Sequence, residues 1–310
     1  MASSSETVHL PLTLASKIAG YHIQPPTGPS PASQAIELSQ ATHRLNLVNK
    51  WSPEAINART SSILEIGCGQ GTCTAVLAEA VSAQAGHVDA IDPAPPSYGA
   101  PFTLAQAHAH LVSSPEIGNL ITFHQADPIK FLVSQPREKK WDVAVLAHCI
   151  WYFPDPSALH DMLLTLCGKV KRVCIAEYAL GASQPEAVPH VLAALATAGL
   201  EANRQGPSTA NIQRLVSPEH IKQAAKTAGW RVEKEGLVVP EKELADGFWE
   251  TSTVVSESFW EDIEQGVESE RVKAMLRAAR DATISAVEKV GNVQDTRTMD
   301  VWVATLVRDE

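Results

Sequence analysis

The fold of this chain is most readable in one short segment, Ile63-Leu64-Glu65-Ile66-Gly67-Cys68-Gly69-Gln70-Gly71-Thr72. The segment begins as an apolar run typical of a buried strand, turns through closely spaced glycines, and continues as a helix from Thr72. Glycine lets the backbone adopt angles that other residues avoid and pass close to a ligand, and the start of a helix offers free N–H groups. The segment therefore predicts a strand, a turn that binds a nucleotide-like ligand, and a helix.

The spacing of the glycines distinguishes this turn from the dinucleotide-binding fingerprint GxGxxG. That fingerprint requires glycine at position 72 for close packing, and this chain has Thr72 there. The pattern, with Glu65 preceding the turn, thus disfavours a nicotinamide or flavin cofactor. An unpaired carboxylate at the end of a buried strand is costly, so we expect a ligand or a water-mediated partner for Glu65.

Strands and helices alternate outward from this segment. Hydrophobic periodicity predicts strands at 62–66, 87–91, 120–124, 141–150 and 172–178, with helices at 72–83, 103–112 and 157–169. Such repetition is typical of an α/β fold, in which helices cover both faces of a parallel sheet. A helix from Ser217 to Gly229 and strands at 230–239 and 299–307 follow later in the chain.

Three segments outside this alternation predict helical additions. Residues 33–50 carry apolar side chains at helical spacing, after a proline-rich stretch at 25–31. Residues 185–200 and the segment ending near Val290 also have helical patterns; the apolar face of the latter comprises Val272, Met275, Leu276, Ala279 and Val287. We expect an N-terminal helical cap over 1–50 and a main domain over 51–310, with helical insertions at about 181–216 and 241–290.

Composition limits the classes of function. The chain has 310 residues, 45% of them hydrophobic, which suffices for a buried core, and its formal charge is −10. Residues 241–270 hold ten carboxylates and one basic residue, so the remainder is nearly neutral. The sequence has no excess of basic residues that could neutralise a phosphate backbone, which argues against DNA or RNA as a partner. The acidic block and the basic residues after it suit an exposed helical insertion, a lid or a dimer element.

Targeting signals and cysteines indicate an intracellular protein. The sequence contains no signal-peptide core and no run approaching about 18 uninterrupted apolar residues. Its five cysteines form no CxxC pair and suit reduced core thiols. We expect a cytoplasmic protein without membrane association, and without a metal, because no His/Cys cluster has ligand spacing.

Four segments in register resemble the class I S-adenosylmethionine-dependent methyltransferases. Glu65-Ile66-Gly67-Cys68-Gly69-Gln70-Gly71 is similar to that family's acidic glycine motif, which holds the methionine portion of the cofactor. Val88-Asp89-Ala90-Ile91-Asp92, followed by Pro93, places an acid where the family binds the ribose hydroxyls. Gln125-Ala126-Asp127 resembles its adenine-binding segment. Trp141 to His148, followed by Cys149-Ile150-Trp151-Tyr152-Phe153, resembles its fourth strand and the aromatic turn that faces the donor methyl.

This resemblance covers about residues 60–180, with a weaker match at 217–239 and 299–307. It implies a Rossmann-like, doubly wound sheet of seven mostly parallel strands, the last antiparallel, with helical lid insertions. It also implies S-adenosyl-L-methionine as cofactor. The cofactor-binding residues that it implies are Glu65, Gly67, Cys68, Gly69, Gly71, Asp92, Pro93, Ala126, Asp127 and His148. Plainer roles stay open: Asp92 as a turn cap before Pro93, and Asp127 as a helix N-cap.

Methyl transfer from a sulfonium is an in-line displacement, so the protein must align the two reactants in a dry pocket and remove any proton. Such sites lie at the carboxyl ends of the strands. There His148 is the candidate base, because histidine titrates near neutral pH; a structural histidine lining the cofactor pocket is the alternative. Residues expected to face the substrate are Tyr21, His43, Trp151, Tyr152 and Glu177.

We therefore expect S-adenosylmethionine-dependent methyl transfer to a small molecule, with the nucleophilic atom open. Two alternatives remain: an S-adenosylmethionine-binding enzyme that does not methylate, such as a cyclase or pericyclase, and a non-catalytic methyltransferase-like subunit. A homodimer is a further expectation, because aromatic residues in the acidic insertion must pack somewhere.

Overall fold

The computed structural model describes residues 9–24, 28, 30–153, 155, 157–205 and 210–308. The described residues form a sheet of seven strands in the order β3-β2-β1-β4-β5-β7-β6. The strands are β1 (Ser62–Ile66), β2 (His87–Asp92), β3 (Ile121–Gln125), β4 (Val143–Ala147), β5 (Arg172–Tyr178), β6 (Arg231–Val238) and β7 (Val301–Val307). Strands β1 to β5 pair in parallel, and β7 runs antiparallel to both β5 and β6. The predicted fold class is confirmed.

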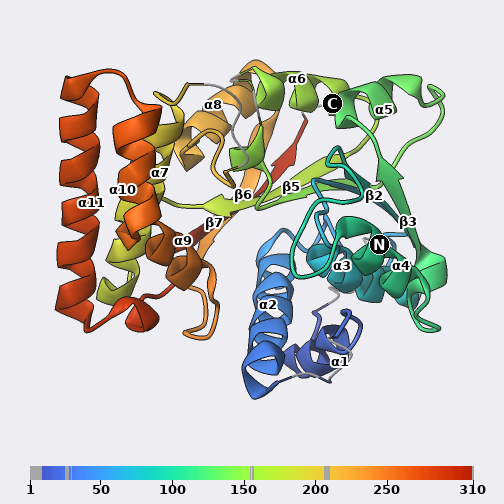
Figure 1. Ribbon diagram of the computed structural model, residues 1–310. Coiled ribbons are helices and arrows are strands. Elements are labelled where there is room, and N and C mark those ends of the chain that lie inside the picture. The colour runs from blue at the N-terminus through green and yellow to red at the C-terminus, as the bar shows by residue number, and fades with distance from the viewer. Residues whose placement is uncertain are drawn as a thin grey trace.

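Helices cover both faces of this sheet (Figure 1). They are α1 (Ala15–Ala19), α2 (Pro31–Lys50), α3 (Thr72–Ser82), α4 (Leu104–Val112), α5 (Pro128–Ser134), α6 (Ala158–Leu166), α7 (Val188–Glu201), α8 (Pro218–Thr227), α9 (Asp246–Val255), α10 (Glu257–Gly266) and α11 (Glu270–Val290). Alternation along β1 sends Ile63 into one core with α2, α3 and α4, and Leu64 into the other with α5, α6 and α8. No helix among the described residues is long and apolar enough to span a bilayer.

The helix α2 is anchored at both ends. Ser30 caps its start by accepting a hydrogen bond from the Ser33 N–H at 3.0 Å. At its other end the Trp51 indole, 2% exposed, donates to the Ile175 carbonyl of β5 at 2.9 Å. Buried residues of α1 and α2 join the same core as β1 and α3. The expected N-terminal cap therefore packs directly on the sheet domain.

The two expected insertions form one helical lobe. Helices α7, α9, α10 and α11 lie together at one side of the sheet (Figure 1), around a core that includes Leu200, Phe259 and Leu276. The expected apolar face of α11 was wrong at Met275, which is 54% exposed, whereas Leu276 is 1% exposed. Gly199 of α7 lets Leu276 approach closely, so the buried stripe centres on that residue.

Candidate functional site

The glycine turn after β1 leaves one side open. Gly67, Gly69 and Gly71 have φ angles of 71°, 52° and 88°, a region that other residues rarely adopt. A Cβ at Gly67 would lie 2.4 Å from Cys149 Cβ, and one at Gly71 would lie 2.5 Å from Leu111 Cδ1. At Gly69 nothing lies within 4 Å. Gly67 and Gly71 are therefore required by packing, whereas Gly69 faces space that a ligand can enter.

Two carboxylates, Asp92 at the end of β2 and Asp127 just after β3, lie at the carboxyl ends of two neighbouring strands beside this turn. The Asp92 oxygens accept hydrogen bonds from the N–H groups of Gly69 and Ala94, each at 2.9 Å, and keep lone pairs for further donors. Asp127 caps α5 by accepting from the Lys130 N–H at 2.9 Å, and its side chain is exposed. The Ala126 N–H donates to the Asp92 carbonyl at 3.1 Å, which joins the ends of β2 and β3. The turn-cap and N-cap roles are thus present, and the ligand-binding roles stay predictions.

Glu65 has a protein partner that sequence reasoning missed. The hydroxyl of Thr74, in the first turn of α3, donates to its carboxylate at 2.5 Å. Burial raises the pKa of Glu65 to about 7, and the Arg44 charge acts in the opposite direction. The Arg44 Nη1 is buried without a hydrogen-bond partner among the described residues. Glu65 thus has the Thr74 hydroxyl as a partner, whereas Arg44 keeps donor capacity for a ligand beside the glycine turn.

His148 occupies the end of β4 in a strained conformation. Its φ is 54°, and its N–H donates to the Ala176 carbonyl at 2.8 Å. Its Nε2 lies 3.0 Å from the Nε2 of His43, and its Nδ1 lies 3.7 Å from a Glu177 oxygen. Burial, and after it the Arg44 charge, holds the pKa of His148 well below its usual range. The imidazole is therefore neutral near neutral pH, and its protonated form requires stabilisation by a neighbouring negative charge such as that of Glu177.

Glu177 positions the aromatic turn after β4. It is 1% exposed and accepts from the N–H groups of Ile150 and Tyr178, each at 3.0 Å. Burial raises the pKa of Glu177 to about 7. The Trp151 and Tyr178 rings lie 5.1 Å apart, and Tyr178 lies 4.6 Å from His148. Tyr152 is 47% exposed, so this turn supplies one buried and one accessible aromatic side chain.

The remaining predicted residues differ in their distance from His148. The Tyr21 hydroxyl donates to Glu79 of α3 at 2.5 Å, so it ties α1 to α3. His43, predicted to face the substrate, is 1% exposed and bonded to His148. Cys68 is buried, and Pro93 is exposed at the end of β2. The structure thus gathers His43, His148, Trp151, Tyr152 and Glu177 on one side of the glycine turn.

Residues of α9 and α4 join this site without a signal in the sequence. Gln40 of α2 donates to Asp246 at 3.4 Å, and Glu250 follows one turn later on α9. Burial and the Asp246 charge raise the pKa of Glu250 to about 7. His108 of α4 lies with Nε2 2.7 Å from the Gly69 carbonyl. Within the uniform acidic block nothing singles out Asp246 or Glu250, since their placement depends on how α9 packs.

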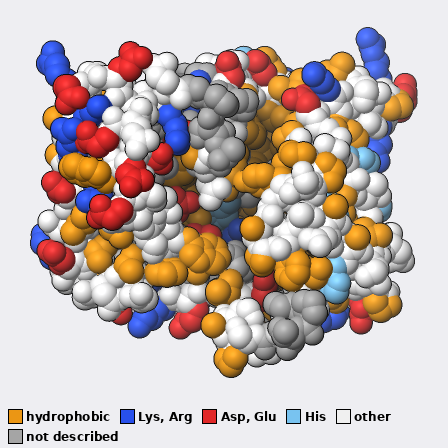
Figure 2. All heavy atoms as spheres, in the orientation of Figure 1, with side chains coloured by type: hydrophobic (Ala, Val, Ile, Leu, Met, Phe, Trp, Pro, Cys, Tyr) orange, Lys and Arg blue, Asp and Glu red, His pale blue; other side chains and the backbone are white. Residues whose placement is uncertain are grey.

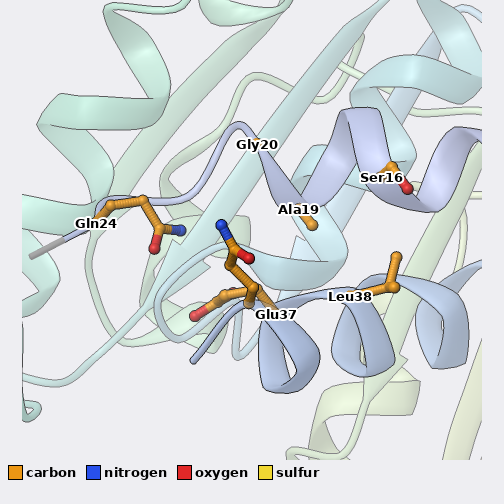
Figure 3. Close-up of a pocket in the computed structure, with 7 residues that line it drawn as sticks. Ser16, Ala19, Gly20, Gln24, Glu37 and Leu38 are labelled. Carbon is orange, nitrogen blue, oxygen red and sulfur yellow. The ribbon is translucent and has the colours of Figure 1, made fainter. Parts of the chain in front are cut away.

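The surface is hollowed where these elements meet. Figure 2 shows a hollow in the middle of one face, with histidine, basic and acidic side chains at its floor and hydrophobic side chains along one wall. A separate cavity of about 350 Å³ lies between α1 and α2, lined by Ser16, Ala19, Gly20, Gln24, Gln34, Glu37 and Leu38 (Figure 3). Its lining shares no residue with the cluster around His148. Among the described residues, no group of three or more His, Cys, Asp or Glu side chains could hold a metal ion.

Comparison with known proteins gives consistent matches. The profile of a methyltransferase domain family matches residues 37–235. The curated proteins Methyltransferase phomM' and Methyltransferase phomM of Diaporthe leptostromiformis are each 34% identical, over 285 and 288 residues, which covers 79% of this chain and 73% of each relative. A solved cyclopropane-fatty-acyl-phospholipid synthase-like protein from Lactobacillus casei is 27% identical, with a TM-score of 0.78, covering 95% of this chain and 99% of that one.

Proposed function

The chain belongs to the class I S-adenosylmethionine-dependent methyltransferases, and on this premise we propose that it methylates a small molecule bound in the hollow beside His148. The observation that carries the proposal is the buried polar cluster of His43, His148 and Glu177, which lies between the glycine turn and the aromatic turn at the carboxyl edge of the sheet. Such an edge is where ligands of doubly wound sheets bind. The near-neutral charge outside the acidic block supports a small acceptor over a nucleic acid.

The residues around the glycine turn fit S-adenosylmethionine. The open side of Gly69 admits a ligand, the Asp92 carboxylate would accept hydrogen bonds from the ribose hydroxyls, and the exposed Asp127 carboxylate would accept one from the adenine amine. The half-buried Arg44 and the buried Glu65 offer a guanidinium and a carboxyl group to its methionine portion. When bound, this cofactor supplies an electrophilic methyl group on a sulfonium.

The chain's own residues align the acceptor and take up its proton. His43 holds the His148 ring through Nε2, while the Nδ1 of His148 has no hydrogen-bond partner among the described residues. Nδ1 is therefore the atom that takes a proton from the acceptor, and Glu177, 3.7 Å away, stabilises the resulting charge. Trp151 and Tyr178 form a wall that excludes water from the cluster.

A second candidate comes from the Lactobacillus casei protein, whose name points to cyclopropane formation on an acyl chain. Mass spectrometry with a deuterated methyl donor separates the two. We expect a product in the small-molecule fraction that retains all three deuterons, whereas a cyclopropane keeps only two. Label in the protein or nucleic-acid fraction would contradict the proposal. Cofactor-dependent conversion without label in any product would indicate a cyclase, and absence of cofactor binding by calorimetry would indicate a non-catalytic subunit.

A further inference from the structure

Helix α9 carries two carboxyl groups, Asp246 and Glu250, close to Tyr152 and Tyr178 of the reaction site. Asp246 and Glu250 are four residues apart and share one face of the helix. The start of α9 is fixed, because the Gly247 N–H donates to the Thr298 hydroxyl at 3.0 Å and a Cβ at Gly247 would lie 2.2 Å from the Arg297 carbonyl oxygen. Gln40 bridges Asp246 to α2. The two carboxylates are thus held in place between the helical lobe and the cap.

The same carboxylates border the aromatic end of the reaction site. Burial, and after it the Asp246 charge, raises the pKa of Tyr178, and Glu177 and Glu250 act in the same direction. Tyr178 in turn contacts His148 ring to ring at 4.6 Å. Asp246 and Glu250 therefore lie within electrostatic reach of Tyr178, whose ring contacts the proposed base His148.

The carboxyl groups of this cluster oppose one another's ionisation. The charge of Asp246 raises the pKa of Glu250, and the Arg44 charge opposes the raised pKa of both Glu177 and Asp246. The histidines add no positive charge, because burial holds the pKa of His43 and His148 well below their usual range. Carboxylates that ionise together away from water are unfavourable unless protons or a cation neutralise them.

Unpartnered polar atoms in the same cluster indicate that it is built to receive a ligand. The His148 side chain is 8% exposed, and its Nδ1 has no hydrogen-bond partner in the described part of the chain. The Nδ1 of His43 and the Nη1 of Arg44 are likewise buried and unpartnered there. Buried atoms without a partner also occur at other described residues, among them His190 and Thr197, but here three of them lie in one cluster and leave capacity for the polar groups of a ligand.

We propose that Asp246 and Glu250 bind a positively charged group of the acceptor, so that the substrate of this enzyme is a protonated amine. The inference rests on the proposed function, since it assumes that the hollow is the acceptor site. The carboxylates supply charge-assisted hydrogen bonds to the ammonium, and the rings of Tyr152 and Tyr178 offer aromatic faces to it. Two carboxyl groups of the acidic block 241–270 would thereby recognise the ammonium group of the acceptor.

Matched ligand sets test this inference without turnover. Protein saturated with S-adenosylhomocysteine is titrated with tyramine, tyrosol and 4-hydroxyphenylacetate, and with hexylamine, hexanol and hexanoate, by calorimetry or NMR. Within each set the carbon skeleton is the same, and only the terminal polar group changes, from ammonium to hydroxyl to carboxylate. We expect the amine to bind at least about tenfold more tightly than its neutral and anionic counterparts in at least one set. Equal binding within both sets, or no binding of either amine, would overturn the inference.

Two double variants show where the selectivity arises. Asp246→Asn with Glu250→Gln should abolish the preference for the amine, whereas Glu241→Gln with Glu243→Gln, which neutralises two exposed carboxylates of the same block, should keep it. A preference that persists in the first variant, or disappears in the second, contradicts the assignment. Unchanged affinity for S-adenosylhomocysteine verifies folding, and the wild-type preference is decisive if a variant fails to fold. Labelled methyl in a neutral small molecule would leave the proposed function standing while the amine inference fails.

Discussion

His148 has an unfavourable backbone conformation that places its imidazole against His43. The φ of 54° costs energy for any residue with a side chain, and the Ala176 and His43 contacts hold it in place. Sequence reasoning selected this histidine from its position after a strand. It did not reveal that the ring pairs with His43, because that contact joins residues 105 positions apart.

The Asp92 carboxylate tests cofactor recognition at the residue scale. Replacing Asp92 by Ala removes the acceptor that binds the Gly69 N–H and faces the expected ribose hydroxyls. We expect affinity for S-adenosylhomocysteine to fall by about 1–3 kcal/mol, since hydroxyls lose their partner. Calorimetric titration measures this change, with thermal melting as the control for folding. Unchanged affinity in a folded variant would remove Asp92 from the site.

Two glycines, Gly67 of the glycine turn and Gly168 between α6 and β5, allow the effect of a steric clash to be separated from that of backbone strain. Gly67 and Gly168 have φ angles of 71° and 78°, but only at Gly67 would a Cβ meet another atom, Cys149 Cβ at 2.4 Å. We expect Gly168→Ala to lower the free energy of unfolding by about 1–2 kcal/mol, and Gly67→Ala to lower it by about 2–4 kcal/mol. Chemical denaturation compares the two variants, and equal losses would show that packing against Cys149 is unimportant.

At the scale of elements, local signals located the helices and missed their partners. Ser217 and Pro218 marked the start of α8, and Gly71 the start of α3, because caps and glycines act locally. The short α5, begun by Asp127, had no periodicity long enough to predict it. The meeting of α2 with α9 could not be predicted either, because it depends on tertiary packing between segments about 200 residues apart.

The anchoring of α2 gives a prediction for this element. Trp51→Phe keeps an aromatic side chain but removes the donor to the Ile175 carbonyl, at 2.9 Å. We expect the free energy of unfolding to fall by about 1–2 kcal/mol, because a buried hydrogen bond is lost. Urea denaturation measures the loss. Trp249→Phe is the matched control, since that side chain is 44% exposed and should change stability by less than about 0.5 kcal/mol. Similar losses in both would argue against the anchor.

For the whole molecule, the resemblance carried by the four motifs implied a mostly parallel sheet of seven strands with the last strand antiparallel, and the structure confirms it. The lobe could not be predicted as one unit, because α7 and α9–α11 lie in separate stretches and cohere only through residues such as Leu200 and Leu276. The acidic block illustrates the same limit. Its net charge was readable, but which carboxylates face the hollow was decided by the packing of Gly247 against Arg297.

Buried histidines make the stability of the molecule depend on pH. Burial lowers the pKa of His22 to about 4 and that of His190 to about 3, and holds the pKa of His43 and His148 well below the usual range. The unfolded chain therefore binds protons below about pH 6.5 that the folded chain does not. As pH falls from about 6.5 to the folded pKa of a given histidine, that histidine lowers the free energy of unfolding by about 1.4 kcal/mol per pH unit.

Buried carboxyls oppose this effect in part of the range. Burial raises the pKa of Glu65, Glu177 and Glu250 to about 7, so the folded chain binds these protons at a higher pH than the unfolded chain does. Their contribution to the free energy of unfolding is fully present below the pKa of the unfolded chain and is lost as pH rises through about 7. We expect the two effects to offset one another between about pH 6.5 and 4.5, and stability to fall below about pH 4.5. Urea denaturation across this range checks the prediction, and stability that keeps rising toward about pH 3.5 would contradict it.

The claim that the hollow beside His148 is where methyl transfer occurs is tested most directly by His148→Asn. The measurement is the rate at which deuterated methyl from S-adenosylmethionine enters the small-molecule fraction, compared with wild type at equal protein concentration. We predict a loss of about 10²–10⁴-fold, the usual contribution of a positioned base, with the affinity for S-adenosylhomocysteine retained. An undiminished rate in the folded variant, or label that follows macromolecules, would contradict the assignment of this site.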